Sequence, residues 1–228
     1  DMVLKDLDLT VPANKVTAIV GSSGSGKTTL MKLLLKFYEP ISGEIKVAEQ
    51  NLASISAKTW RNVCGVVMQE GFIFSDTIAN NIAIGVDNID KNRLRHACNV
   101  ANIKDHIEAL PLGYNTKIGM DGIGLSTGQK QRILIARAVY KNPDYLFFDE
   151  ATSALDATNE KIIMNNLDQF FEGKTVVVIA HRLSTVKNAD QIIVLEKGKI
   201  VETGNHAELT ALRGSYYELV KNQLELGN

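Results

Sequence analysis

A short apolar strand that runs into a glycine-rich loop and then a helix constrains this chain more than any other feature. The loop reads GSSGSGKTT, residues 21–29, and it directly follows the apolar run that ends at Val20. Glycines let such a backbone fold into a concave nest whose N–H groups point at phosphate oxygens, and the positive end of the following helix adds to the attraction. A flexible linker needs neither a strand before it nor Lys-Thr after it. The spacing G-x-x-x-x-G-K-[ST] therefore predicts a nucleotide phosphate loop.

Within this loop we expect Lys27 to reach the β and γ phosphates of ATP and the Thr28 hydroxyl to ligate Mg²⁺. The expected nucleotide-binding residues of the loop are Gly21, Ser22, Ser23, Gly24, Ser25, Gly26, Lys27, Thr28 and Thr29.

A second half of the site is predicted at the sequence YLFFDE, residues 145–150. Four apolar residues form a central strand and leave two carboxylates at its C-terminal end, where open parallel sheets bind ligands. We expect Asp149 to hold Mg²⁺ through water and Glu150 to orient or deprotonate the attacking water. An apolar strand that ends in Asp-Glu is weak evidence alone, but the phosphate loop makes it strong.

The composition is that of an ordinary globular domain, with 45% hydrophobic and 22% charged residues. The formal net charge is -1 and the basic residues are scattered, which argues against a bulk electrostatic grip on nucleic acid. No apolar run approaches the ~20 residues needed to cross a bilayer. Cys64 and Cys98 lack the spacing of a zinc site or a disulfide framework, so we expect two buried thiols. We interpret the chain as an excised piece of a longer protein.

The order of elements predicts an α/β fold with a doubly covered parallel sheet, because runs such as TVVVIA are apolar on both faces. Alternating apolar residues in 3–11 predict antiparallel edge strands at the N-terminus. The tail from Asn205 predicts two short helices separated near Gly214. The other expected core elements are strands at 15–20, 66–68, 145–149, 175–180 and 191–195, and helices at 28–36, 128–140 and 159–171.

The middle region, about 72–124, has helical patterns near 77–83, 91–101 and 104–109 and no convincing strand. We interpret it as a helical insertion. The predicted fold is a P-loop NTPase with a mixed, mainly parallel sheet core, an N-terminal antiparallel β subdomain and an inserted helical subdomain. We expect one domain over 1–228, with a core lobe at about 1–71 and 130–228 and a helical lobe at about 72–129.

The sequence LSTGQ, residues 125–129, precedes a helix about 100 residues after the phosphate loop and closely resembles the LSGGQ signature of ABC ATPases. Three further marks occur in family order: Gln69 after a strand, SALD at 153–156 just after Glu150, and His181 at the end of a strand. The resemblance covers essentially the whole chain.

The resemblance implies that two copies pack head to tail and trap two nucleotides, with the signature of one copy completing the site of the other. It implies that His181 hydrogen-bonds the γ-phosphate and that Gln69 touches Mg²⁺ or the attacking water. Asp156 is then expected to contact the partner copy. Ser126, Gly128 and Gln129 are expected to hold the nucleotide bound by that partner, because a helix N-terminus attracts anions even without a lysine.

The chain also resembles exporters among ABC proteins. Its segment FIFSDTI, residues 72–78, is similar to a segment that receives a short coupling helix from the membrane domain, although packing inside the helical lobe is an equally open interpretation. The runs 180–209 and 214–223 resemble the exporter pattern, and the tail resembles bacterial peptide and bacteriocin exporters. The resemblance therefore implies a location on the cytoplasmic face of the bacterial inner membrane and a transmembrane domain as partner.

Three positions depart from the family pattern. Thr127 stands where glycine is usual, Asp121 is the only acid in 116–122, where exporters usually have a glutamate, and the aromatic residue that stacks on adenine is not in the chain. Two alternative functions remain open from the residues: a soluble ABC ATPase acting on ribosomes or DNA, and a regulatory module that binds ATP without turnover. Lys27, Gln69, Asp149, Glu150 and His181 are all present, which favours the exporter motor.

Overall fold

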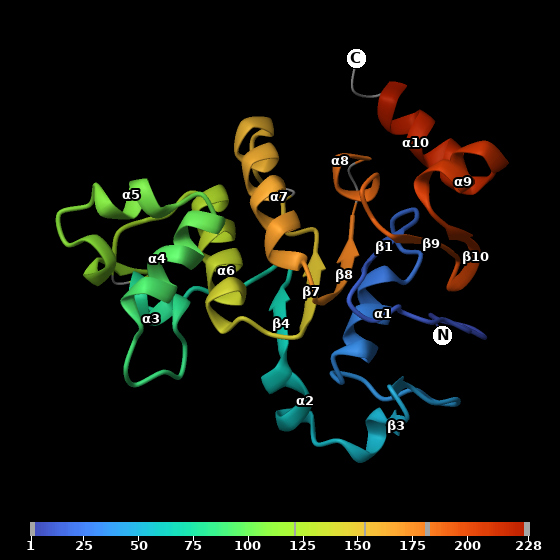
Figure 1. The fold of residues 1–228 in the computed structure, drawn as a ribbon, viewed down its shortest axis with the longest axis horizontal. Helices are drawn as coiled ribbons and strands as arrows, with labels where there is room; N and C mark the ends of the chain where they lie inside the picture. Colours follow the sequence, from blue (N-terminus) through green and yellow to red (C-terminus); the bar gives the residue numbers. More distant parts are fainter. Residues whose placement is uncertain (1–2, 121, 153, 181–182, 226–228) are drawn as a thin grey trace. The chain divides into compact units, whose positions relative to one another are not determined.

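The computed structural model describes residues 3–120, 122–152, 154–180 and 183–225. It divides into two compact units (Figure 1). The first consists of Asp1–Cys64, Asp144–Asp149 and Gly173–Asn228, and the second of Gly65–Pro143 and Glu150–Glu172. Strand β4 (Cys64–Val67) lies where the chain passes from the first unit to the second.

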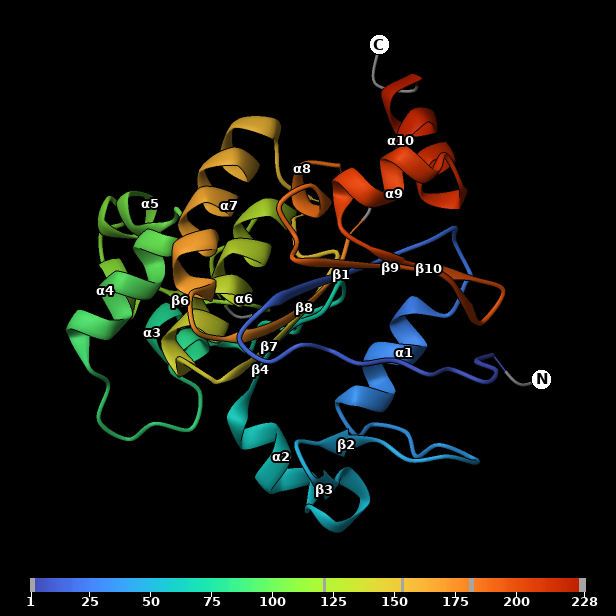
Figure 2. The same ribbon diagram turned by 45° about the vertical axis from the view of Figure 1, so that its right-hand side comes forward.

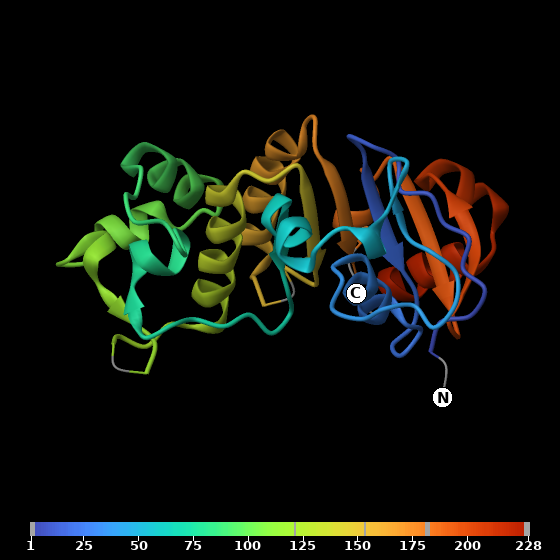
Figure 3. The ribbon, with the colours of Figure 1, turned by 90° about the horizontal axis from the view of Figure 1, so that it is seen from below.

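The first unit is built on a sheet whose strands follow the order β10-β9-β1-β8-β7. Strand β1 pairs in parallel with β8 and β9, and β7 pairs in parallel with β8, whereas β10 is antiparallel to β9. Figure 3 shows β1 in blue between the orange strands. The bounds are β1 (Val16–Val20), β7 (Tyr145–Asp149), β8 (Thr175–Ile179), β9 (Gln191–Glu196) and β10 (Lys199–Gly204).

The three parallel neighbours β1, β8 and β9 are buried along almost their whole length. Continuous burial, instead of alternation, is what apolar residues on both faces of a parallel strand produce. Strand β10 alternates between exposed and half-buried residues, as expected for an antiparallel edge strand with one solvated face. The expected parallel core is confirmed, and β10 was not predicted.

Helix α1 (Lys27–Leu34) follows the glycine-rich loop and buries Leu30 and Met31. Helix α2 (Ala57–Val63) is anchored by Trp60, whose indole N–H donates to the Leu34 carbonyl at 2.8 Å and whose ring lies 4.9 Å from that of Tyr145. Between the two helices, β2 (Lys46–Val47) and β3 (Gln50–Asn51) form a two-residue antiparallel ladder, followed by a 3-10 turn η1 (Leu52–Ser54).

The antiparallel edge strands expected at 3–11 are wrong: residues 3–15 contain no strand. Asp6 has φ 50, a left-handed conformation that interrupts an extended strand. The segment is tied to its surroundings by a backbone hydrogen bond from Lys5 N to Gly198 O at 2.9 Å, and the Leu4 side chain reaches Gly26. The alternating pattern thus reflects half-buried side chains on an extended surface segment that lacks a ladder.

The second unit is mainly helical, as predicted for the middle region. Helix α4 packs along α6, and α3 also contacts α6. Strands β5 (Asp76–Thr77) and β6 (Lys117–Ile118) pair in a two-residue ladder that was not predicted. The helices are α3 (Ile78–Ile82), α4 (Lys91–Val100), α5 (Lys104–Glu108), α6 (Thr127–Lys141) and α7 (Ala157–Phe171), with a 3-10 turn η2 (Gly113–Asn115).

Both cysteines are buried free thiols, as expected. Burial raises the pKa of the Cys98 thiol to about 12, so this group stays protonated and unreactive at neutral pH.

The C-terminal part of the first unit consists of α8 (Leu183–Val186), α9 (His206–Leu212) and α10 (Ser215–Glu225). Figure 2 shows α9 and α10 following β10. The Glu202 carboxylate of β10 accepts hydrogen bonds from the backbone N–H groups of Ser215 and Tyr216, which caps the start of α10. The two predicted tail helices and their separation at Gly214 are confirmed. In the described part of the chain, no helix has the length and apolar character needed to span a membrane.

Candidate nucleotide site

The phosphate loop begins at the end of β1 and makes a close turn against β9. A Cβ atom on Gly21 would lie 2.1 Å from the Leu195 carbonyl oxygen, a distance no side chain tolerates. Gly26 caps α1 with φ 106, and a Cβ there would lie 2.5 Å from the Leu4 side chain. Gly21 is therefore required by space as well as by backbone conformation, whereas Gly26 is required by its positive φ, because the Leu4 side chain could move aside. The loop's remaining members, Ser22, Ser23 and Gly24, are exposed, whereas Thr29 is half-buried in α1.

Lys27 folds back over this loop. Its ammonium group donates to the carbonyl oxygens of Gly21 and Ser22, both at 2.9 Å, and the residue is only 6% exposed. A phosphate oxygen would be a stronger acceptor for this ammonium than a neutral carbonyl, because hydrogen bonds between charged groups are about twice as strong as neutral ones. Ser25 is also buried, and its hydroxyl has no hydrogen-bond partner within the described residues. The loop thus supplies an ammonium group and a hydroxyl group that are suited to bind phosphate oxygens.

Asp149 is brought to this loop by strand register. Ile19 pairs with Ile179, which pairs with Asp149, so the end of β7 and the start of the loop lie at the same sheet edge. Thr28 Oγ1 donates to Asp149 Oδ2 at 3.1 Å, and Asp149 is 1% exposed. A hydroxyl and a carboxylate are the hard oxygen donors that Mg²⁺ prefers when phosphates supply further ligands. These residues fit a nucleotide-bound Mg²⁺.

Glu150, the next residue along the chain, belongs to the second unit and has φ 51. Its carbonyl accepts a hydrogen bond from Gln131 Nε2 at 3.0 Å, while Gln131 Oε1 accepts one from the Ala154 N–H at 3.0 Å. One buried glutamine on α6 therefore holds the backbone of both Glu150 and Ala154. Sequence reasoning missed Gln131, although a glutamine on the buried face of a predicted helix is a signal that could have found it.

The signature motif forms the N-terminus of α6. Ser126 is the N-cap: its hydroxyl accepts from the Gln129 N–H, and the Gln129 side chain in turn accepts from the Ser126 N–H at 2.8 Å. This capping box leaves the N–H groups of Thr127 and Gly128 without a carbonyl partner inside the helix. Thr127 is the first residue of the helix, and its side chain is exposed. The Gln129 side chain serves the cap in this structure, and its expected contact with nucleotide stays a prediction.

Gly128 packs closely on the turn that precedes α7. A Cβ at this position would lie 3.3 Å from the Ala154 carbonyl oxygen. Two residues further on, Asp156 caps α7 by accepting from the Asn159 N–H at 3.0 Å. Hydrogen bonds from the backbone and side chain of Asn159 lower the pKa of Asp156. The signature and Asp156, both predicted to face a partner, thus lie near each other in the second unit.

The remaining predicted residues are less constrained. Gln69 is exposed directly after β4, and His181 lies outside the described residues. In the segment 72–78, Phe72 and Phe74 stack edge to face with ring centroids 5.0 Å apart, and they are 67% and 46% exposed. Arg137 holds this segment from α6 by donating to the carbonyls of Phe72 and Asn81. The two rings are therefore surface groups and not core residues of the helical unit.

The phosphate loop lies at the end of β1, and an aspartate at the end of the parallel strand β7 is hydrogen-bonded to its threonine. This arrangement is typical of a P-loop nucleoside triphosphatase. The family model described as ABC transporter matches residues 4–153. The chain belongs to the ABC transporter family, as an ATP-binding domain of the exporter type.

Known proteins similar to this chain include ABC transporter B family member 13 of Arabidopsis thaliana, 47% identical over 98% of the chain. The ATP-dependent lipid A-core flippase of Methylococcus capsulatus is 47% identical over 96% of it, and the exotoxin translocation ATP-binding protein PaxB of Pasteurella aerogenes 48% over 98%. The chain spans 18%, 36% and 31% of these relatives' lengths.

A solved structure of a bacterial Atm1-family ABC exporter with ATP bound superimposes with a TM-score of 0.93. It is 41% identical to the chain and covers 97% of it, while the chain covers 39% of that protein. The predicted P-loop fold and the predicted exporter family are confirmed.

Proposed function

We propose that this chain is the ATP-hydrolysing motor of an ABC exporter, in which ATP-driven association of two copies moves an attached membrane domain. The observation that carries the proposal is the built phosphate site of the first unit, with Lys27 held over the loop and Thr28 bonded to Asp149. The names of the relatives, which include a flippase and a toxin translocation protein, favour transport over action on ribosomes or DNA.

In this proposal the phosphate loop residues 21–29 bind the triphosphate, with Lys27 moving its donors from the loop carbonyls to the β and γ phosphates. Thr28 and Asp149 would hold Mg²⁺, which would neutralise part of the phosphate charge. Glu150 orients or deprotonates the attacking water, and Gln69 and His181 contact the metal, water or γ-phosphate. The presence of Glu150 favours turnover over an ATP-binding regulatory module.

The second copy supplies the other face of each site. The uncapped N–H groups of Thr127 and Gly128, together with the Ser126 hydroxyl hydrogen, form an anion cradle at the start of α6. This cradle contains no lysine, so it complements a nucleotide already held elsewhere better than it binds one alone. Asp156, which lies near this cradle, is proposed to contact the partner copy.

The membrane domain is proposed to dock on the exposed rings of Phe72 and Phe74 through its coupling helices. Exposed aromatic residues are enriched at protein interfaces, and Arg137 keeps these two rings fixed at the surface. The motor would then act at the cytoplasmic face of the membrane. The peptide-exporter subclass inferred from the tail stays a prediction.

The test is the oligomeric state of a Glu150→Gln variant with and without saturating Mg-ATP. This substitution keeps the shape of the side chain and removes its ability to take a proton, so a closed ATP-bound dimer should accumulate. A Lys27→Ala, Glu150→Gln double variant is the control that should remain monomeric. A Glu150→Gln chain that binds ATP and stays monomeric at every concentration would overturn the two-copy mechanism.

A further inference from the structure

The Gln129 side chain makes two contacts that fix its orientation. Gln129 Oε1 lies 2.8 Å from the Ser126 backbone nitrogen, and Gln129 Nε2 lies 3.1 Å from His106 Nε2. A backbone N–H can only donate, so the amide oxygen of Gln129 must face Ser126. The amide NH₂ group, which can only donate, therefore faces the histidine.

This orientation assigns the tautomer of His106. Because Gln129 donates, His106 Nε2 must accept, and the ring proton lies on Nδ1. His106 is then the acceptor that keeps the Gln129 amide from rotating away from Ser126. Residues on two different helices, α5 and α6, are joined by this one hydrogen bond.

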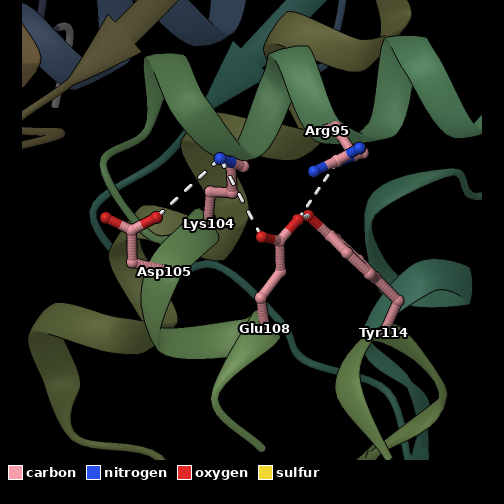
Figure 4. Close-up of polar contacts among 5 residues, drawn as sticks. All are labelled: Arg95, Lys104, Asp105, Glu108 and Tyr114. Carbon is pink, nitrogen blue, oxygen red and sulfur yellow. Dashed lines mark hydrogen bonds and ion pairs between the residues drawn. The ribbon is translucent and has the colours of Figure 1, made fainter.

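Helix α5 is held firmly enough to serve as the support. Ile107 is fully buried, next to His106 in the sequence. Glu108 accepts from Arg95 Nε of α4 at 3.1 Å and from the Tyr114 hydroxyl of η2 at 3.4 Å, and Lys104 lies 3.9 Å from it (Figure 4). Exposed ion pairs contribute little to stability, so burial of Ile107 does most of the anchoring and the polar contacts fix the direction of the helix.

Loss of the hydrogen bond between His106 and Gln129 would affect the first turn of α6. Without an acceptor at position 106, the Gln129 NH₂ group loses a partner and its oxygen is no longer confined to the Ser126 N–H. The capping box then opens from one side, and the first turn frays. The N–H groups of Thr127 and Gly128, which the proposed function directs at the partner's nucleotide, would lose their fixed direction.

We propose that His106 is a positioning residue of the signature: through its hydrogen bond to Gln129 it holds the capping box closed and aims the start of α6. The structural part of this inference stands on the contacts of one unit. Its functional part rests on the proposed two-copy mechanism. His106 itself touches no nucleotide in this account and acts only through Gln129.

Three variants of the chain separate this role from general packing. His106→Phe keeps a ring of similar size and removes the acceptor. His106→Gln restores an acceptor oxygen at a similar distance from the backbone. His96→Phe is the matched control, because His96 is an exposed histidine on α4 of the same unit.

The first measurement is hydrogen exchange of the backbone N–H groups of Ser126 and Gln129 in the absence of nucleotide. We expect exchange to be about fivefold faster in His106→Phe, the effect of losing one ordinary hydrogen bond, and unchanged in His96→Phe. His106→Gln should return exchange to the wild-type rate. The inference would be overturned if His106→Phe exchanged at the wild-type rate, or if His106→Phe and His106→Gln exchanged at the same rate.

The second measurement places the same variants in the Glu150→Gln background and follows dimerisation with Mg-ATP. We expect His106→Phe to raise the dimer dissociation constant by on the order of tenfold, because both sites of the dimer lose a fixed signature. ATP affinity of the dilute monomer should stay within about twofold, since the phosphate loop is untouched. Faster exchange without any dimer in the parent variant would uphold the positioning role and refute the two-copy function.

Discussion

Glu150 adopts a left-handed backbone conformation, with φ 51, that is unfavourable for a residue with a side chain. Such conformations cluster at functional sites and persist only where surrounding contacts impose them. Here the imposing residue is Gln131, which bonds the carbonyl of Glu150 and the N–H of Ala154. The direction of the proposed catalytic carboxylate therefore depends on a glutamine that is itself buried in α6.

Replacing Gln131 by leucine should lower turnover more than nucleotide binding. Two part-buried backbone groups would lose their partners, which costs about 1–2 kcal/mol of unfolding free energy, and the Glu150 turn would relax. We expect ATP turnover to fall about tenfold while ATP affinity changes less than about twofold, measured by phosphate release and by nucleotide titration. The control is Gln169→Leu on the exposed face of α7, and equal losses in both variants would contradict the positioning role.

Gly21→Ala should abolish nucleotide binding because its Cβ would collide with the Leu195 carbonyl oxygen. Moving a backbone carbonyl of a central strand is costly, so we expect a loss of about 1–3 kcal/mol in unfolding free energy as well. The control is Gly43→Ala, where φ is +80 but no atom lies within 4 Å of the added Cβ. That variant should lose only about 1 kcal/mol and keep full ATP affinity, as measured by calorimetry and chemical unfolding. Normal binding by Gly21→Ala would refute the close-turn argument.

At this scale the sequence identifies residues by motif and misses those that act through a second residue. Lys27, Thr28 and Asp149 could be found because the loop spacing and the acidic strand end are specific. His106 could not, because its role depends on which side chain it faces after folding, and the only signal for Gln131 was its place on the buried face of a predicted helix. The contact between the Gln129 side chain and the Ser126 N–H likewise depends on side-chain rotation, which the sequence pattern does not specify.

Among the elements, those with an unbroken apolar run or a strong helical period were predicted best. Strand β7 has the predicted bounds, and β8 differs by one residue, because YLFF and TVVVI leave no other way to bury both faces. The N-terminal segment was mispredicted because alternation specifies a half-buried surface but not a neighbouring strand. Strands β5 and β6 are two residues long and carry no periodic signal at all.

Helix α7 has a titratable N-cap residue, Asp156. Because Asn159 lowers the pKa of Asp156 below 3.8, the ionised cap stabilises the helix above that pH, and this stabilisation is lost as the pH falls through the folded-state value. Asp156→Asn still caps through its side-chain oxygen and does not titrate. We therefore expect the difference in melting temperature between wild type and Asp156→Asn to shrink below about pH 3.8. A difference that stays constant from pH 7 to about pH 2.5 would show that the charge of the cap does not matter.

On the scale of the whole molecule, one copy contains two kinds of anion site that differ in chemistry. The phosphate loop of the first unit carries a buried lysine and a hydroxyl–carboxylate pair, whereas the start of α6 in the second unit offers amide donors and a serine hydroxyl. In the proposed mechanism the first binds the triphosphate, and the second adds binding energy to a phosphate that is already neutralised. This asymmetry is what a head-to-tail dimer requires, because each interface then joins unlike halves.

Mixing two inactive variants tests that arrangement directly. Lys27→Ala removes the phosphate cation and Ser126→Arg fills the signature cradle, so each chain alone should show little ATP turnover. In a head-to-tail dimer of the two, one site joins the intact Lys27 of one chain to the intact Ser126 of the other. Random pairing makes half of the dimers mixed, each with one working site of two, so an equal mixture should regain about a quarter of wild-type turnover. If each copy completed its own site, no mixture could recover activity, because every site would then contain one of the two substitutions.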